Sequence, residues 1–135
     1  RNARLLKPNR GLNMAKILVI EDDEQFREML AQMLEQSGHQ VETAANGVLG
    51  LMQFRQSPPD LVITDILMPE KDGIDVIIDM KREQDDVRII AISGGRRTIT
   101  PQFNLDSAAL IGVRQTLTKP FNREQLLQAI QNALE

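Results

Sequence analysis

The chain has 135 residues, a length that fits one domain, and its content of 41% hydrophobic and 26% charged residues is that of a folded protein rather than a disordered one. It contains no cysteine and one histidine, which excludes disulfides, thiolate metal sites and a site built from several histidines. No apolar run reaches the ~20 residues that a membrane helix needs, so we expect no membrane partner.

The charge is unevenly distributed along the chain. Residues 1–13 contain four basic residues and no acid, whereas acidic residues outnumber basic ones 19 to 12 over 14–135. An acidic body argues against nucleic-acid binding, and the absence of Trp and Tyr leaves few rings on which bases could stack. Because Met14 is a natural starting residue, we expect 1–13 to be an added or disordered N-terminal extension and 14–135 to be the folded domain.

Strand-like and helix-like patterns alternate along the chain. Residues 17–20 form a short apolar run, and the apolar residues after it recur at helical spacing up to Ser37-Gly38. Further strands are predicted at 41–44, 61–64, 89–92 and 115–119. Helices are predicted between them, the fourth a short one over 105–111, and a last helix follows with Asn122 as its N-cap.

Five strands alternating with five helices predict an α/β fold, a doubly wound parallel sheet with helices on both faces. The runs 17–20, 61–64 and 89–92 are apolar throughout, as in central strands, whereas 41–44 and 115–119 include polar residues, as in edge strands. A strand order of 2-1-3-4-5, the flavodoxin-like order, satisfies this pattern. Right-handed crossovers then place helices one and five on one face and the other three on the opposite face.

Charged and hydroxyl side chains follow the predicted strands at their carboxyl ends. They are Glu21-Asp22-Asp23 for the first strand, Asp65 for the third, Ser93 for the fourth and Lys119-Pro120 for the fifth. In an open parallel sheet these ends meet at one edge, and ligands bind there, where the strand order reverses. We therefore expect acids, a hydroxyl and a lysine to converge on one site.

This group of residues indicates phosphoryl chemistry assisted by a metal. Clustered carboxylates repel one another, so the site favours a cation. Oxygen donors without histidine or cysteine suit a hard ion, Mg²⁺ before Ca²⁺. A carboxylate beside Mg²⁺ can attack a phosphoryl group to form an aspartyl phosphate, and a lysine neutralises the charge that develops.

Five motifs carry a family resemblance. They are Ile17-Leu18-Val19-Ile20-Glu21-Asp22-Asp23, Val62-Ile63-Thr64-Asp65-Ile66-Leu67-Met68-Pro69, Asp72-Gly73, Ile92-Ser93-Gly94 and Thr118-Lys119-Pro120-Phe121. In this order and spacing, over residues 15–135, they resemble the receiver domain of two-component response regulators, in particular single-domain receivers similar to chemotaxis regulators. The resemblance implies a receiver fold and a phosphoacceptor function in a two-component system or phosphorelay.

The resemblance also implies a role for each site residue. Asp65 would be the phosphoacceptor, and Lys119 and Ser93 would contact the phosphoryl oxygens. The implied Mg²⁺ ligands are Asp22 directly, Glu21 through water, Asp65, and the backbone carbonyl of Leu67. Asp23 is expected at the start of the first helix instead, where its charge suits the positive helix end.

The implied partners are a sensor histidine kinase or a histidine phosphotransfer protein as donor, and a downstream protein whose binding changes on phosphorylation. Since no output domain follows the last predicted helix, we expect output through protein contact or a phosphorelay, and we expect a cytoplasmic location. The chain would be a signalling receiver rather than an enzyme, catalysing only its own phosphorylation and dephosphorylation.

The chain departs from the family pattern in two places. Thr116 stands where the family usually has an aromatic switch residue, and the segment from Ser93 to Gly112, which contains Arg96-Arg97, is longer than usual. We therefore expect the signal to leave the site through the segment after Ser93, with Thr116 filling space rather than a ring rotating.

Other functions remain as alternatives. An aspartate-based phosphohydrolase needs an acid two positions after its nucleophile, and that position here is Leu67. A flavodoxin-like flavin carrier needs a phosphate cradle after the first strand, where residues 21–23 would repel a phosphate. A receiver that signals without phosphorylation is disfavoured by the complete acceptor set. His39 follows a helix-ending glycine, where we expect a capping or solvent-exposed role.

Overall fold

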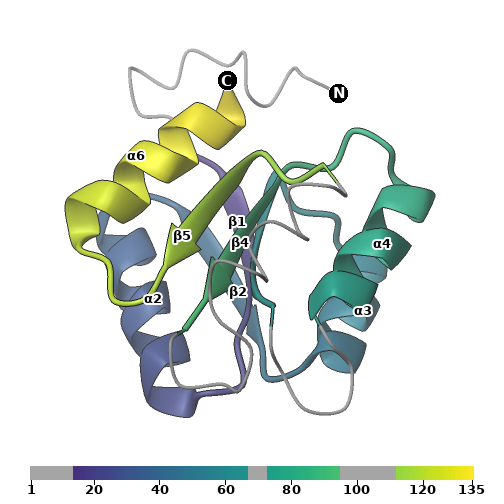
Figure 1. Ribbon diagram of the computed structural model, residues 1–135, viewed down its shortest axis with the longest axis horizontal. Coiled ribbons are helices and arrows are strands. Elements are labelled where there is room, and N and C mark those ends of the chain that lie inside the picture. Colours follow the sequence, from purple (N-terminus) through teal and green to yellow (C-terminus); the bar gives the residue numbers. More distant parts are fainter. Residues whose placement is uncertain (1–13, 67–72, 95–111) are drawn as a thin grey trace.

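The computed structural model describes residues 14–66, 73–94 and 112–135 (Figure 1). In chain order its elements are β1 (Lys16–Ile20), α2 (Glu24–Gln36), β2 (Gln40–Ala44), α3 (Gly47–Gln56), β3 (Leu61–Asp65), α4 (Gly73–Glu83), β4 (Ile89–Ser93), β5 (Gln115–Thr118) and α6 (Arg123–Leu134). All five predicted strands are confirmed within one residue at each end. The predicted short helix over 105–111 lies outside the described residues.

The strands form one sheet of order β2-β1-β3-β4-β5, and every neighbouring pair is parallel. The predicted α/β fold and strand order are confirmed. β3 and β4 are buried along their whole length, and β1 is buried from its second residue onward, while β2 and β5 are partly exposed. The difference in polarity between central and edge strands therefore does set their positions.

Helices cover both faces of the sheet, with α2 and α6 on one face and α3 and α4 on the other (Figure 1). Each face has its own apolar core. Leu30 and Leu34 of α2 pack with Leu126 and Ile130 of α6, and the second core joins residues of α3 and α4 that include Phe54, Val76 and Met80. Within the described residues no helix has the length and hydropathy needed to span a membrane.

Side-chain caps fix where three helices begin. Asp23, Asn46 and Asn122 are the N-caps of α2, α3 and α6, and each accepts a hydrogen bond from the backbone N–H three residues later. Asn122 and Gln125 form the predicted reciprocal capping box. Asp23 is thus tied to the helix start, as expected, and its cap fixes α2 directly beside the acidic end of β1.

His39 takes the expected capping role through its backbone, because its N–H donates to the Leu34 carbonyl at 3.1 Å at the end of α2, but its side chain is not solvent-exposed. Its imidazole is half-buried, and Nδ1 accepts a hydrogen bond of 3.1 Å from the backbone N–H of Ala15. Gly38, with φ of 96°, ends α2 and turns the chain so that His39 reaches the start of β1. Burial lowers the pKa of His39, because the charged imidazolium loses hydration.

We expect His39 to make the unfolding free energy depend on pH. The folded-state pKa lies below the usual 6.5, so the stabilisation is complete above pH 6.5 and is lost as the pH falls towards the folded-state pKa. A neutral hydrogen bond of this kind contributes about 1 kcal/mol. His39→Asn places an amide oxygen where Nδ1 lies and cannot titrate.

The measurement is urea unfolding of wild type and His39→Asn at several pH values, followed by far-UV circular dichroism. As the pH decreases below 6.5, we expect the unfolding free energy of wild type to decrease relative to that of the variant. A constant difference between the two proteins across this range would contradict the prediction.

Candidate functional site

The acidic cluster lies where β1 and β3 end side by side, at the reversal of strand order. Glu21 directly follows β1 and Asp65 is the last residue of β3, and these two residues are only 1% and 2% exposed. Asp22 is half-buried next to them. One carboxylate oxygen from each of Glu21, Asp22 and Asp65 lies within 4.8 Å of the other two. The predicted convergence of these acids is confirmed.

Lys119 lies in the same cluster, although it comes from the end of β5. Its Nζ is 3.1 Å from Glu21 Oε1 and 3.2 Å from Asp65 Oδ2, so one ammonium group pairs with two buried carboxylates. Burial alone lowers the pKa of Lys119, but Asp65 and Glu21 outweigh it and the net pKa is raised. The lysine is therefore a charged group within reach of both acids. Its peptide bond to Pro120 is cis.

Glu21 shows the electrostatic state of the cluster. Burial, followed by repulsion from Asp65, raises its pKa to about 7, against the opposing effects of the Asp23 N–H and Lys119. The cluster brings three carboxylates together and Lys119 pairs with two of them, so the repulsion between the carboxylates favours an added cation. An all-oxygen donor set with excess negative charge fits a hard divalent cation, so the described residues match the predicted kind of metal site.

Ser93 and Gly94 bring the end of β4 to the same edge. Ser93 is fully buried, its hydroxyl donates to the Gly94 carbonyl at 3.5 Å, and its own carbonyl accepts from the Lys119 N–H at 2.8 Å. A Cβ on Gly94 would lie 3.2 Å from Lys119 Cδ, so glycine leaves room for the lysine stem. The serine and the lysine are thus held together by their backbones.

Two predictions about the site fall on residues outside the described ranges. These are the carbonyl of Leu67 as a metal ligand and the switch segment after Ser93, which lies almost wholly outside those ranges. They stay predictions.

Three contacts at the site were not predicted from the sequence. The Phe26 ring faces Lys119, with Nζ 4.2 Å from the ring centroid. Arg27 Nη1 donates to the Glu21 carbonyl at 2.8 Å. A Cβ on Gly73 would lie 2.1 Å from the Asp65 carbonyl oxygen, so α4 begins directly against the end of β3. Of Phe26, Arg27 and Gly73, only Gly73 belongs to one of the five motifs, while Phe26 matches a core position at helical spacing.

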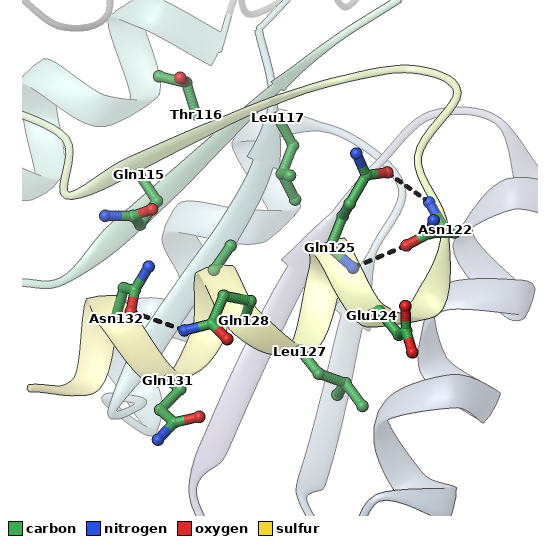
Figure 2. Close-up of a pocket in the computed structure, with 11 residues that line it drawn as sticks. Gln115, Thr116, Leu117, Asn122, Glu124, Gln125, Leu127, Gln128, Gln131 and Asn132 are labelled. Carbon is green, nitrogen blue, oxygen red and sulfur yellow. Dashed lines mark hydrogen bonds between the residues drawn. The ribbon is translucent and has the colours of Figure 1, made fainter.

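A hollow among the described residues lies elsewhere, between β5 and α6 (Figure 2). It has a volume of about 720 Å³ and is lined mainly by amide side chains, including Gln115, Gln128 and Asn132. Glu124 is its one ionisable lining residue. Thr116 is exposed, and its side chain points away from α6, on the opposite side of β5 from Leu117 (Figure 2). Since acids and lysine meet at the strand ends instead, we place the chemistry there.

Comparison with known proteins places this geometry in a family. The family model for the response regulator receiver domain matches residues 17–131. The DNA-binding transcriptional regulator NtrC of Azospirillum brasilense is 35% identical over 91% of this chain, which covers 25% of that protein. The chemotaxis protein CheY of Halobacterium salinarum is 31% identical over 90% of this chain and 98% of that protein.

Solved structures agree with the sequence comparisons. A response regulator receiver domain protein from Clostridium thermocellum superposes with a TM-score of 0.82 and 32% identity, covering 90% of this chain and 94% of that one. The chain spans a quarter to about half of the length of several curated relatives, such as NtrC and the mycobacterial regulator MprA. With the family match over 17–131 and the acidic cluster and lysine at the strand ends, the chain belongs to the response regulator receiver domain family.

Proposed function

We propose that Asp65 is the phosphoacceptor of this receiver domain. The observation that carries the proposal is the placement of Lys119 Nζ 3.2 Å from Asp65 Oδ2 inside a buried acidic cluster. A single carboxylate that is buried, paired with a cation and located at the edge where the strand order reverses is suited to accept a phosphoryl group. The family role in phosphoacceptor signalling, which the comparisons support over the phosphohydrolase and flavin-carrier alternatives, agrees with this assignment.

In the proposed reaction an Asp65 carboxylate oxygen attacks the phosphorus of a phosphohistidine. The new O–P bond forms as the N–P bond breaks, and the imidazole leaves with the electron pair and takes up a proton. Lys119 would move its charge from the Asp65 carboxylate to a phosphoryl oxygen, and the Ser93 hydroxyl would donate to another. Both groups stabilise negative charge that develops during transfer.

The acidic cluster would hold Mg²⁺ through Asp22, Asp65, Glu21 by way of water, and the carbonyl of Leu67. When bound, Mg²⁺ supplies positive charge that offsets the repulsion between the carboxylates and an incoming phosphoryl group. Burial of Glu21 and Asp65 keeps bulk water from screening these charges. The receiver role is a signalling role, and we propose that catalysis is limited to its own phosphorylation and dephosphorylation.

Receiver domains of this family receive phosphoryl groups from kinases. We infer that the donor here is a sensor histidine kinase or a histidine phosphotransfer protein, and that phosphorylation changes the binding of a downstream protein. We infer that the domain acts in the cytoplasm. The acidic body of the domain supports a protein partner rather than nucleic acid.

Mass spectrometry tests the proposal directly. One sample of the chain is incubated with acetyl phosphate and Mg²⁺. In a second sample, EDTA is added before the acetyl phosphate. We expect one phosphoryl adduct with Mg²⁺, carried by the peptide that contains Asp65, and none with EDTA. Steady release of phosphate from unrelated phosphate esters would instead support the phosphohydrolase alternative, and absence of any adduct would remove the proposed function.

We expect Mg²⁺ binding to depend on Asp22. Removing a directly coordinating carboxylate with Asp22→Ala should raise the dissociation constant at least about tenfold. Mutating a residue that only hydrogen-bonds to a metal ligand already lowers metal affinity by that factor. Isothermal titration calorimetry measures the constant. Asp23→Ala is the matched control, because its carboxylate caps α2 instead. It should lower stability by about 1 kcal/mol and leave Mg²⁺ affinity close to wild type; equal affinity of wild type and Asp22→Ala would refute the ligand assignment.

A further inference from the structure

The ammonium group of Lys119 contacts an aromatic ring as well as the carboxylates of Glu21 and Asp65. On another side lies the ring of Phe26, from the first turn of α2, with Nζ 4.2 Å from the ring centroid. This distance is within the range of a cation–π contact, in which the negative face of the ring attracts the cation. The lysine side chain is 22% exposed, so the ring supplies one of the few surfaces that shield it from water.

The Phe26 ring is itself held in place. It contacts Phe121 in a T-shaped arrangement, with centroids 5.7 Å apart and an interplanar angle of 80°. Its backbone N–H donates to the N-cap Asp23 at 3.0 Å, so the first turn of α2 is fixed beside the acidic cluster. Phe26 and Phe121 both pack against the apolar core shared by α2 and α6. A ring fixed from two sides can define the position of a flexible lysine.

We propose that Phe26 is a positioning residue that holds Lys119 for phosphoryl transfer to Asp65. This inference rests on the proposed function and goes beyond it by assigning a role to a residue outside the acceptor motifs. Lys119 has four rotatable bonds, and its ammonium must reach Asp65 rather than remain with Glu21 alone. The ring face limits the positions that the Lys119 ammonium can take. By excluding water, it also strengthens the attraction of the ammonium to negative oxygens.

The Phe26 ring acts on the Lys119 ammonium through the charge of its face as well as through its shape. During phosphorylation by acetyl phosphate, the Asp65 oxygen forms a bond to phosphorus while the P–O bond to acetate breaks and acetate leaves with the electron pair. The ammonium must then follow charge from the carboxylate to the phosphoryl oxygens. A leucine at position 26 would fill space beside Lys119 but would present no negative face to it.

The test separates charge from shape. Phe26→Leu should slow phosphorylation by acetyl phosphate about threefold to tenfold, and Phe26→Tyr should retain the wild-type rate. Site-specific incorporation of mono-, di- and trifluorophenylalanine at position 26 withdraws charge from the ring face with little change in size. We expect the rate to fall stepwise along this series. The same series at Phe54, a core ring of α3, is the control and should leave the rate unchanged.

A second readout does not depend on phosphorylation. In wild type without a phosphodonor, the ε-methylene protons of Lys119 should have NMR shifts moved upfield by the ring, and Phe26→Leu should abolish this displacement. If wild type forms no adduct but the displacement is present, the proposed function fails while the contact stands. Equal phosphorylation rates across the fluorinated series, or an undisplaced Lys119 signal in wild type, would overturn the positioning role.

Discussion

Asp65→Asn should abolish the phosphoryl adduct formed with acetyl phosphate and Mg²⁺, a loss of at least about a hundredfold in rate. The amide keeps the size and shape of the side chain but its oxygen is a poor nucleophile, so the acceptor is lost while the packing is kept. Mass spectrometry of the intact chain measures the adduct. Because the chain has no Trp or Tyr, far-UV circular dichroism is the appropriate check that the variant unfolds cooperatively.

Asp85→Asn is the matched control for this change. Asp85 is exposed and lies between α4 and the start of β4, at the edge of the parallel sheet opposite the carboxyl ends, so the variant should be phosphorylated at the wild-type rate. An adduct that still formed at the normal rate in Asp65→Asn would show that another residue accepts the phosphoryl group. Peptide mapping would then identify that residue, with Asp22 as the neighbouring carboxylate.

Gly73→Ala should be the most destabilising single-methyl change at the site. The added Cβ would lie 2.1 Å from the Asp65 carbonyl oxygen and 2.6 Å from Ile66 Cα, and both are backbone atoms that cannot rotate away. The Gly73 N–H also donates to the Ile66 carbonyl at 2.8 Å, which fixes the approach. We expect a loss of about 3 kcal/mol, although alanine within a helix normally gains about 1 kcal/mol over glycine.

Urea unfolding followed by circular dichroism measures this loss. Gly38→Ala is the control, because no atom lies within 4 Å of its added Cβ and its cost, about 1 kcal/mol, comes only from a φ of 96°. The variant at Gly73 should in addition be phosphorylated more slowly, since the clash displaces the backbone of Asp65. A stability equal to that of wild type would contradict the packing argument.

The fold could be predicted from the sequence because the buried and edge strands differ in polarity within their own short segments. Continuous apolar runs mark the buried strands, and polar residues at 40–44 and 115–118 mark the edges. The convergence of Glu21, Asp65 and Lys119 followed from topology alone, since the carboxyl ends of parallel strands share one edge. For these features the residues in each short segment contain the necessary information.

Other features depend on how distant segments pack. The contact between Phe26 and Lys119 joins α2 to the loop after β5, and it depends on the docking of a helix and on two side-chain conformations. The inward position of His39 depends on its contact with Ala15, which directly precedes β1. Similarly, the pKa of Glu21, about 7, results from the depth of burial and the nearby charge of Asp65, and neither is visible in a linear pattern.

The edge strand β2 has a consequence for self-association. An outermost strand offers backbone groups to which a strand of another molecule can add, and this is a common route to aggregation. β2 has five residues and includes Glu42, whose partly exposed carboxylate lies 3.9 Å from Lys16 Nζ. A copy of the same strand aligned against β2 would bring a second carboxylate towards the first. The short length and the charge of this edge therefore oppose growth of the sheet beyond one molecule.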